Sequence, residues 1–166
     1  MNLQLLREAP GICIYYDTCN DWLFIDWQGD LSLRAIQRAT LELAQCVLAR
    51  PYTRVLNSNL LVTSISWEAA PWMLRELLPH LHLAGVEHLA WVRPESLRGQ
   101  QLVNSMLSQL PGLCVALFDE MDLAVTWLQR HRPPTLMGCP PPLHSPEAQA
   151  RLAQLIQRVS DELRPA

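Results

Sequence analysis

One stretch, residues 53–92, constrains the fold of this chain more than any other. An apolar run ends at Leu56, a helical pattern extends from Ser66 to a glycine stop at Gly85, and a second apolar run follows at residues 89–92. Two strands joined by a helix pair in parallel, because parallel neighbours need a connection of a dozen or more residues. The stretch therefore predicts an α/β protein.

An antiparallel hairpin is expected before this unit. Residues 12–16 and 22–28 are rich in β-branched and aromatic side chains, and turn-forming residues separate them. In the second strand Trp22 and Phe24 point to the face opposite to Leu23, so both faces of the strand are expected to contact apolar groups.

Further strands and helices continue the alternation. Ser32 is expected to cap a helix that ends at Pro51, and a helix through Leu102 and Met106 is expected before a strand at residues 113–118. Asp119 is then expected to cap another helix. The predicted order after the hairpin is helix, strand, helix, strand, helix, strand and helix.

The chain is long enough for one well-buried core. It has 166 residues, of which 49% are apolar and 17% are charged. We expect an α/β domain at residues 1–132 and a stiff proline-rich connector at residues 133–145. The amphipathic helix expected at residues 146–166, capped by Ser145, is predicted to dock on an open sheet face, in the same chain or across a dimer.

Composition excludes several classes of function. The net charge is -3 and no basic stripe is present, so nucleic acid is not an expected partner. All 13 basic residues are arginine, which excludes lysine Schiff-base chemistry and a phosphate-binding loop of the GKS/T type. No apolar run is long enough for a membrane span, no export signal is recognisable, and the five cysteines are irregularly spaced. We expect a cytoplasmic protein with reduced thiols.

The helix within the central unit carries three local predictions. Ser66 is expected to cap its start, although Pro71 offers an alternative first helical residue. Pro79 is expected to kink the helix, because it cannot donate to the Arg75 carbonyl. Gly85 is expected to end the helix in the left-handed conformation.

The candidate site is the segment that joins the first strand of this unit to its helix. Ligands of α/β sheets usually bind where a parallel strand ends and a helix begins. Large aromatic residues beside such a segment often anchor protein interfaces. The predicted site residues are Asn57, Ser58, Asn59, Ser64, Ser66, Trp67 and Trp72. The alternative is that the serines only form turns and a cap and that the tryptophans are partly buried.

No sequence motif indicates a metal, a cofactor or catalysis. His80 and His82 lie two apart on a predicted helix and point away from each other, and His88 begins a strand. No nucleophile elbow or glycine-rich loop is present. We therefore expect no bound cofactor and no metal, and an enzyme that uses one of these histidines as a base is the weakest of three hypotheses.

Two segments resemble a known family. LLPHLHLAGVEHLAWVRPES at residues 77–96 and GLCVALFDEMDLAVTWL at residues 112–128 are similar to STAS/SpoIIAA-like domains, in particular to a small bacterial branch. Trp72, Pro79, the Ala84–Gly85 pair and residues 94–96 follow the order found in that branch. The resemblance implies a SpoIIAA-like α/β fold and a non-enzymatic regulatory module that binds a protein or a second copy of itself.

The resemblance lacks one feature of the regulatory members of this family. Anti-sigma-factor antagonists carry a phosphorylatable serine in an Asp-Ser-Ser-Gly-like sequence, which is absent here, although Ser64 or Ser66 could occupy the corresponding helix start. The rival hypothesis is a carrier of a small anionic or lipid-like ligand, in which residues 57–67 line the pocket.

Overall fold

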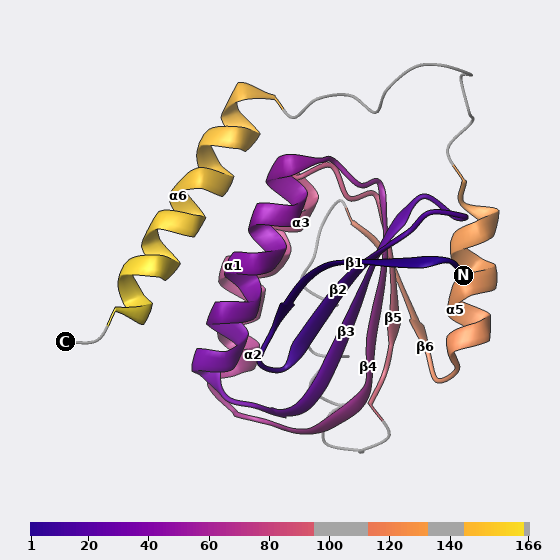
Figure 1. Cartoon of the computed structure of the whole chain (residues 1–166), viewed down its shortest axis with the longest axis horizontal. Helices are drawn as coiled ribbons and strands as arrows, with labels where there is room; N and C mark the ends of the chain where they lie inside the picture. Colours follow the sequence, from indigo (N-terminus) through magenta and orange to yellow (C-terminus); the bar gives the residue numbers. More distant parts are fainter. Residues whose placement is uncertain (95–112, 133–144, 165–166) are drawn as a thin grey trace.

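A mixed sheet forms the centre of the computed structural model, which describes residues 1–94, 113–132 and 145–164. In these residues six strands lie in the order in which they occur in the chain (Figure 1). The first three pair antiparallel and the last three continue from the third in parallel. The strands are β1 (Leu3–Ala9), β2 (Ile12–Asp17), β3 (Trp22–Leu31), β4 (Arg54–Ile65), β5 (His88–Val92) and β6 (Cys114–Phe118). The predicted α/β class and its hairpin are confirmed.

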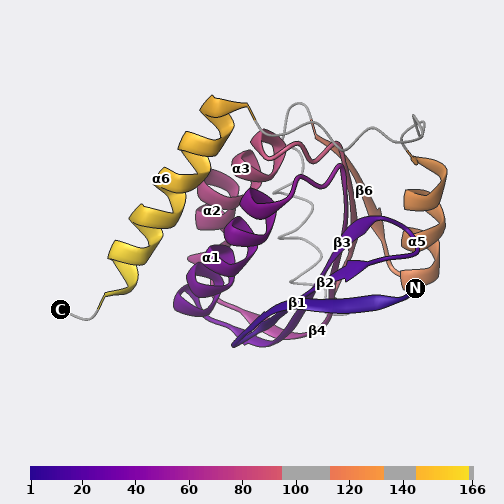
Figure 2. The same cartoon turned by 45° about the horizontal axis from the view of Figure 1, so that its top comes forward.

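Helices cover both faces of this sheet (Figure 2). Helices α1 to α3 lie on one face, α5 lies on the other, and α6 lies outside α1. The described helices are α1 (Leu33–Ala49), α2 (Ala69–Trp72), the π-helical turn η1 (Met73–Leu77), α3 (Leu78–Leu83), α5 (Met121–Arg130) and α6 (Pro146–Leu163). The helix predicted through Leu102 and Met106 and the proline-rich connector lie outside the described residues.

Strand β1 was not predicted from the sequence. It forms the outer edge of the sheet beside β2, with an irregularity in its register between Leu5 and Arg7. Most of its side chains are exposed, and among the described strands β1 pairs only with β2. A short, bulged and charged edge strand is a common way to limit uncontrolled strand pairing.

Helix α1 follows its predicted pattern. The Ser32 hydroxyl accepts a hydrogen bond from the Ala35 amide at 3.2 Å, which satisfies one of the free N–H groups at the helix start. Ile36, Leu43 and Val47 recur at helical spacing and are buried against the sheet. This helix contacts β1 and shares one hydrophobic core with the inward side chains of β2, β3 and β4.

The segment before the central helix differs from the prediction. The first strand of the unit does not end at Leu56, because β4 continues to Ile65 alongside the long strand β3. The helix begins at Ala69, and the Ser66 hydroxyl is buried without a hydrogen-bond partner, so the predicted Ser66 cap is wrong. The Ser66 carbonyl accepts from the Ala69 amide at 3.1 Å and forms a turn instead.

The predicted glycine stop of this helix is confirmed, and a π-helical turn lies before Pro79, where a kink was predicted. The helix is interrupted just before Pro79, where η1 widens the turn and the Leu78 amide donates to the Met73 carbonyl. Gly85 has a φ of 88°. The Gly85 amide donates to the His82 carbonyl at 3.0 Å and the Val86 amide to the Leu81 carbonyl at 3.1 Å, which is the Schellman arrangement.

Helix α5 starts differently from the prediction. Its N-terminal cap is Glu120, which makes no side-chain capping bond. The Asp119 carboxylate instead accepts three hydrogen bonds from the Arg93 guanidinium, the shortest at 2.6 Å. Asp119 therefore joins the ends of β5 and β6 and does not cap the helix.

Helix α6 docks within the same chain, against helices and not against the sheet. Its Ser145 cap is confirmed, since the hydroxyl accepts from the Ala148 amide at 3.1 Å. Leu152, Leu155 and Val159 are buried in the core cluster that α1 and α3 share. The predicted docking on an open sheet face is wrong, because α1 to α3 already cover that face and leave an apolar outer surface for α6. No helix in the described ranges combines the length and the hydropathy needed to cross a lipid bilayer.

Candidate interaction surface

The structure places six of the seven predicted site residues in two groups and buries the seventh, Trp72, apart from both. Asn57, Ser58 and Asn59 are buried inside β4. The Asn57 side-chain oxygen accepts a hydrogen bond from the Trp27 indole at 2.9 Å, and the Asn59 amide group donates to the Val92 carbonyl at 3.3 Å. These side chains therefore stabilise contacts between strands and are not open to a ligand from solvent. Their prediction as a loop is wrong.

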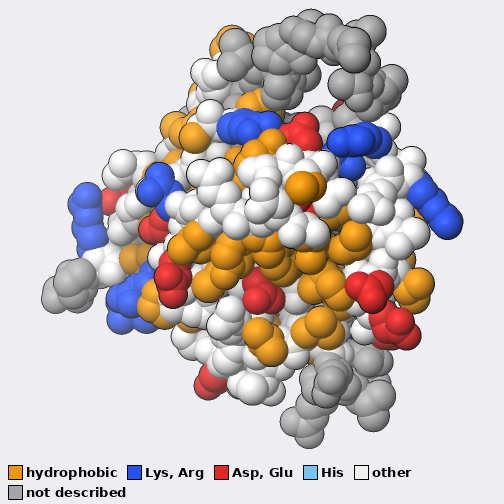
Figure 3. Space-filling view, turned by 45° about the vertical axis from the view of Figure 1, so that its right-hand side comes forward, with side chains coloured by type: hydrophobic (Ala, Val, Ile, Leu, Met, Phe, Trp, Pro, Cys, Tyr) orange, Lys and Arg blue, Asp and Glu red, His pale blue; other side chains and the backbone are white. Residues whose placement is uncertain are grey.

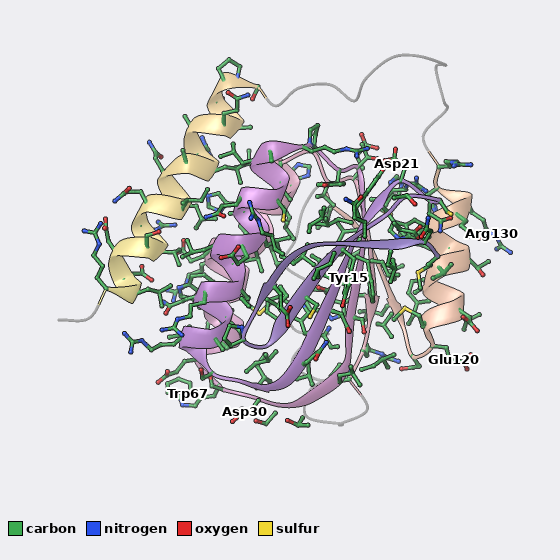
Figure 4. All side chains as sticks on the ribbon, in the orientation of Figure 1. Tyr15, Asp21, Asp30, Trp67, Glu120 and Arg130 are labelled. Atoms are coloured by element: carbon green, nitrogen blue, oxygen red, sulfur yellow. The ribbon has the colours of Figure 1, made fainter. Side chains whose placement is uncertain are left out.

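The second group lies at the far end of β3 and β4, near the labelled residues Trp67 and Asp30 (Figure 4). The Ser64 hydroxyl donates to the Asp30 carboxylate, and the Ser66 amide donates to the Leu31 carbonyl at 3.0 Å. The Trp67 side chain is 80% exposed. This end of the sheet thus presents a large aromatic side chain to solvent beside polar groups.

Trp72 does not belong to this surface. It is 8% exposed and packs in the core with Met73 and Leu77. The predicted alternative of burial therefore holds for Trp72, whereas Trp67 is exposed. Of the seven predicted residues, the structure brings together Ser64, Ser66 and Trp67.

A surface that the sequence did not reveal lies on the face that carries α5. Strand register places Leu5, Tyr15, Phe24 and Leu56 in one row across β1, β2, β3 and β4. Helix α5 packs on β4, β5 and β6. No described helix packs on β1 and β2 from this side, so the row passes from the buried core into an open half-face. Apolar side chains gather on this side of the molecule (Figure 3).

We define the open half-face by Leu3, Leu5 and Tyr15, which lie beside the buried ring of Phe24. Leu3 is 39% and Leu5 51% exposed, whereas Phe24 is 7% exposed. The rings of Tyr15 and Phe24 stack with centroids 5.7 Å apart. The sequence held one signal for this surface, since the alternation in β3 indicated apolar contacts on both faces. The rest of the surface could not be predicted, because β1 was not predicted as a strand and the register between strands is not visible in the sequence.

Acidic groups border the open half-face. Glu8, Cys13 and Asp26 form the neighbouring row on β1, β2 and β3. A hydrogen bond with the Cys13 thiol raises the pKa of Tyr15, and partial burial and the charges of Cys13, Asp26 and Glu8 raise it further. The apolar row therefore lies beside a negatively charged margin.

A polar network connects α5 to the turn between β2 and β3. The Arg54 side chain is buried, and its guanidinium donates to the Leu128 carbonyl at 3.1 Å and to the Asn20 and Asp21 carbonyls of the β2–β3 turn. Burial lowers the pKa of Arg54, although the side chain remains a cation at neutral pH. This residue connects the last turn of α5 to the hairpin.

The three histidines singled out in the sequence do not meet in space as a group of metal ligands. His88 contacts His131 on α5, with ring centroids 4.8 Å apart, and both rings contact Trp127. Among the described residues, no three side chains of His, Cys, Asp or Glu are placed to hold a metal ion. The four described cysteines are free thiols.

Two of the hollows on the surface of the described residues lie beside α6. One, of about 660 Å³, lies between α6 and the segment formed by η1 and α3. The other, of about 580 Å³, lies along α6. Neither is lined by residues 57–67, the segment that the carrier hypothesis requires as its pocket.

Comparisons with known proteins gave similar structures but no similar sequences. No protein-family model and no curated protein matches the chain. An uncharacterised DUF3478-family protein from Shewanella loihica with a SpoIIAA-like fold is 17% identical, with a TM-score of 0.48, over 76% of this chain and 91% of that one. The anti-sigma factor antagonist SpoIIAA in its unphosphorylated form is 10% identical, with a TM-score of 0.47, over 77% and 97%.

Proposed function

We propose that this chain is a non-enzymatic protein-interaction module that binds another protein through the open half-face of its sheet. One observation carries the proposal: an apolar row runs from the buried Phe24 through Tyr15 to the exposed Leu5, and no described helix packs on the β1 and β2 end of this row. Antiparallel strands can leave one face to solvent, but that face is then normally polar, whereas clustered exposed apolar side chains indicate an interaction site.

The acidic margin indicates the chemistry of the partner. Glu8 and Asp26 flank the apolar row on the same face of the sheet. A partner segment with apolar side chains beside lysine or arginine would complement this pattern. Charge pairs at the rim of an interface mainly affect the association rate, so binding should weaken as salt rises.

Trp67 offers a second contact. Exposed tryptophans are often interface anchors, and Trp67, which follows Ser64 and Ser66 in the chain, is 80% exposed. A phosphate on Ser64 would place new negative charge against the Asp30 carboxylate and break the bond between them. We propose that the module acts in the cytoplasm, on a protein partner or on a second copy, and not on nucleic acid.

Quantitative affinity enrichment of the full-length chain from its own host tests the proposal. Replacing both Leu3 and Leu5 by glutamine should reduce recovery of the principal partner at least tenfold, because the apolar contact is lost. The matched control is Leu123→Gln, which changes a leucine on α5 with a similar exposed fraction of 55%. The partner, once identified, is then titrated with purified chain at about 50 mM and about 300 mM salt.

The outcomes separate the candidate surfaces. Loss of binding in the double variant, with binding retained by Leu123→Gln, supports the open half-face. If only the Trp67→Ala variant loses partner binding, the interface lies at the end of β4 instead. Sedimentation of the purified chain identifies a second copy as the partner. If the double variant binds as the wild type does, the proposed surface is wrong, and native mass spectrometry of a retained small molecule would instead favour the carrier hypothesis.

A further inference from the structure

The larger hollow beside α6 has walls from two distant parts of the chain. Arg75, Glu76 and His80 line it from η1 and α3, and Arg151, Gln154, Leu155 and Arg158 line it from α6. We call it the α3–α6 groove. Its volume of about 660 Å³ lies within the range of small-molecule sites.

Positive charge exceeds negative charge on the walls of this groove. Three guanidinium groups line it, whereas Glu76 supplies one carboxylate. Glu76 is already paired with Arg158. This local excess contrasts with the net charge of -3 on the whole chain.

The other two arginines are not held by strong partners. The Arg75 Nε atom donates to the Pro71 carbonyl at 3.3 Å, and no carboxylate of the described residues forms an ion pair with its guanidinium. Arg151 pairs with Glu147 one turn earlier on α6, but 54% of the Arg151 and 72% of the Glu147 side chain is exposed. Exposed pairs of this kind contribute little stability and exchange readily.

We propose that the α3–α6 groove binds a small oxoanion with more than one negative charge, of the phosphate ester or polyphosphate class. Arginine forks match the oxygen geometry of phosphate and carboxylate groups. Gln154 can hydrogen-bond a neutral part of such a ligand, and Leu155 provides an apolar floor. This proposal does not depend on the open half-face.

Binding in the groove would also fix the position of α6. Arg151 and Arg158 belong to α6, whereas Arg75 belongs to η1, so one anion would contact both walls. A ligand that binds only the docked state stabilises that state in proportion to its occupancy. The ligand would therefore control how firmly the C-terminal helix is held.

Calorimetric titration and thermal unfolding of the full-length chain test this site. Sodium pyrophosphate should bind and should raise the melting temperature by about 4 °C at a tenfold excess over Kd. Inorganic phosphate at equal ionic strength should raise it less. Citrate tests whether the groove prefers carboxylates. If citrate binds as tightly as pyrophosphate, the ligand class is a polycarboxylate and the phosphate assignment is wrong.

Substitutions locate the site. Arg75→Gln and Arg151→Gln together should weaken pyrophosphate binding at least tenfold, while Arg130→Gln, an exposed arginine on α5 at the opposite side of the sheet (Figure 4), should leave Kd unchanged. If the double variant binds as tightly as the wild type, or if the wild type binds no pyrophosphate, the proposal is wrong. The open half-face variants should bind pyrophosphate normally, so failure here is distinct from failure of the proposed function.

Discussion

Serine hydroxyls near three helix starts have different environments in this protein. The hydroxyls of Ser32 and Ser145 each accept a hydrogen bond from a backbone amide in the first turn of α1 and α6. The Ser66 hydroxyl is buried and has no partner. Residue type alone therefore does not identify a cap, because the backbone must also leave a free amide within reach.

Alanine substitutions at these serines should separate the two environments. We expect Ser32→Ala and Ser145→Ala each to lower the free energy of unfolding by about 1 kcal/mol, because each leaves a helix amide unsatisfied. Ser66→Ala should be neutral or slightly stabilising, because it removes an unpaired polar group. Urea denaturation of the three variants measures the effect. A loss at Ser66 equal to that at Ser32 would show that Ser66 caps a helix after all.

His88 links stability to pH. Burial lowers the pKa of His88 below its ordinary value of 6.5, and the neighbouring His131 lowers it further. Glu87 raises this pKa by a smaller amount, and Arg54 has the smallest effect, which lowers it. Below pH 6.5 the unfolded chain binds a proton at this residue that the folded chain resists. The stability present above that pH is therefore lost as the pH falls through the lower, folded pKa.

The urea midpoint should accordingly decrease between about pH 7 and about pH 5, and His88→Gln should flatten this dependence. His82→Gln, at an exposed position on α3, is the matched control and should keep the wild-type slope. Equal slopes in wild type and His88→Gln would exclude His88 as the titrating group.

At the scale of elements, the docking of α6 on the other helices can be measured directly. Leu152 and Leu155 are each 1% exposed and Val159 is fully buried, so undocking would expose a continuous apolar stripe. An isolated helix of this length is only marginally stable in water. Docking and helix formation should therefore be coupled.

Leu152→Ala tests this coupling. We expect the α6 amides to lose hydrogen-exchange protection by about 2 to 4 kcal/mol, as a core truncation would cause, while the β3 and β4 amides change less. Ala153→Ser, at an exposed position of the same helix, is the control. Unchanged protection in α6 would mean that the helix forms without support from α1.

The elements that the sequence predicted are those with strong local signals. α1, α6 and β5 carry clear periodicity, serine caps or glycine stops, and they lie where they were expected. The prediction ended β4 too early, because Asn57 and its polar neighbours have a low strand propensity. Pairing with the long strand β3 overrides this propensity. β1 was missed because its side chains are mostly exposed and its register is irregular.

The candidate surface was less predictable than the fold. Trp67 and Trp72 are only five residues apart in the chain, yet one is 80% and the other 8% exposed. Which one faces solvent depends on the direction in which the chain leaves β4. The open half-face depends on strand register, and the α3–α6 groove requires two segments about eighty residues apart, Glu76 and Arg158 among them. Neither relation is visible in a single sequence.

At the scale of the whole molecule, the two faces of the sheet are covered unequally. α1 to α3 cover one face and carry α6 as a further layer, whereas α5 covers only part of the other (Figures 1 and 2). The α3–α6 groove and the open half-face therefore lie on opposite sides of the sheet. Variants at one site should have additive effects with variants at the other, since distant sites without shared contacts rarely couple.

The strand order has a consequence for synthesis in the cell. Each strand of the sheet pairs with the strand that precedes it in the chain, from β1 to β6. When each of the strands β2 to β6 leaves the ribosome, the strand with which it pairs has therefore already been made. None of these strands is later inserted between two earlier ones. Such sequential pairing shortens the loops that must close and favours folding during translation, from the N-terminus onward. Helix α6 follows all the strands in the chain, so the outer surface of α1 stays uncovered until α6 has been made.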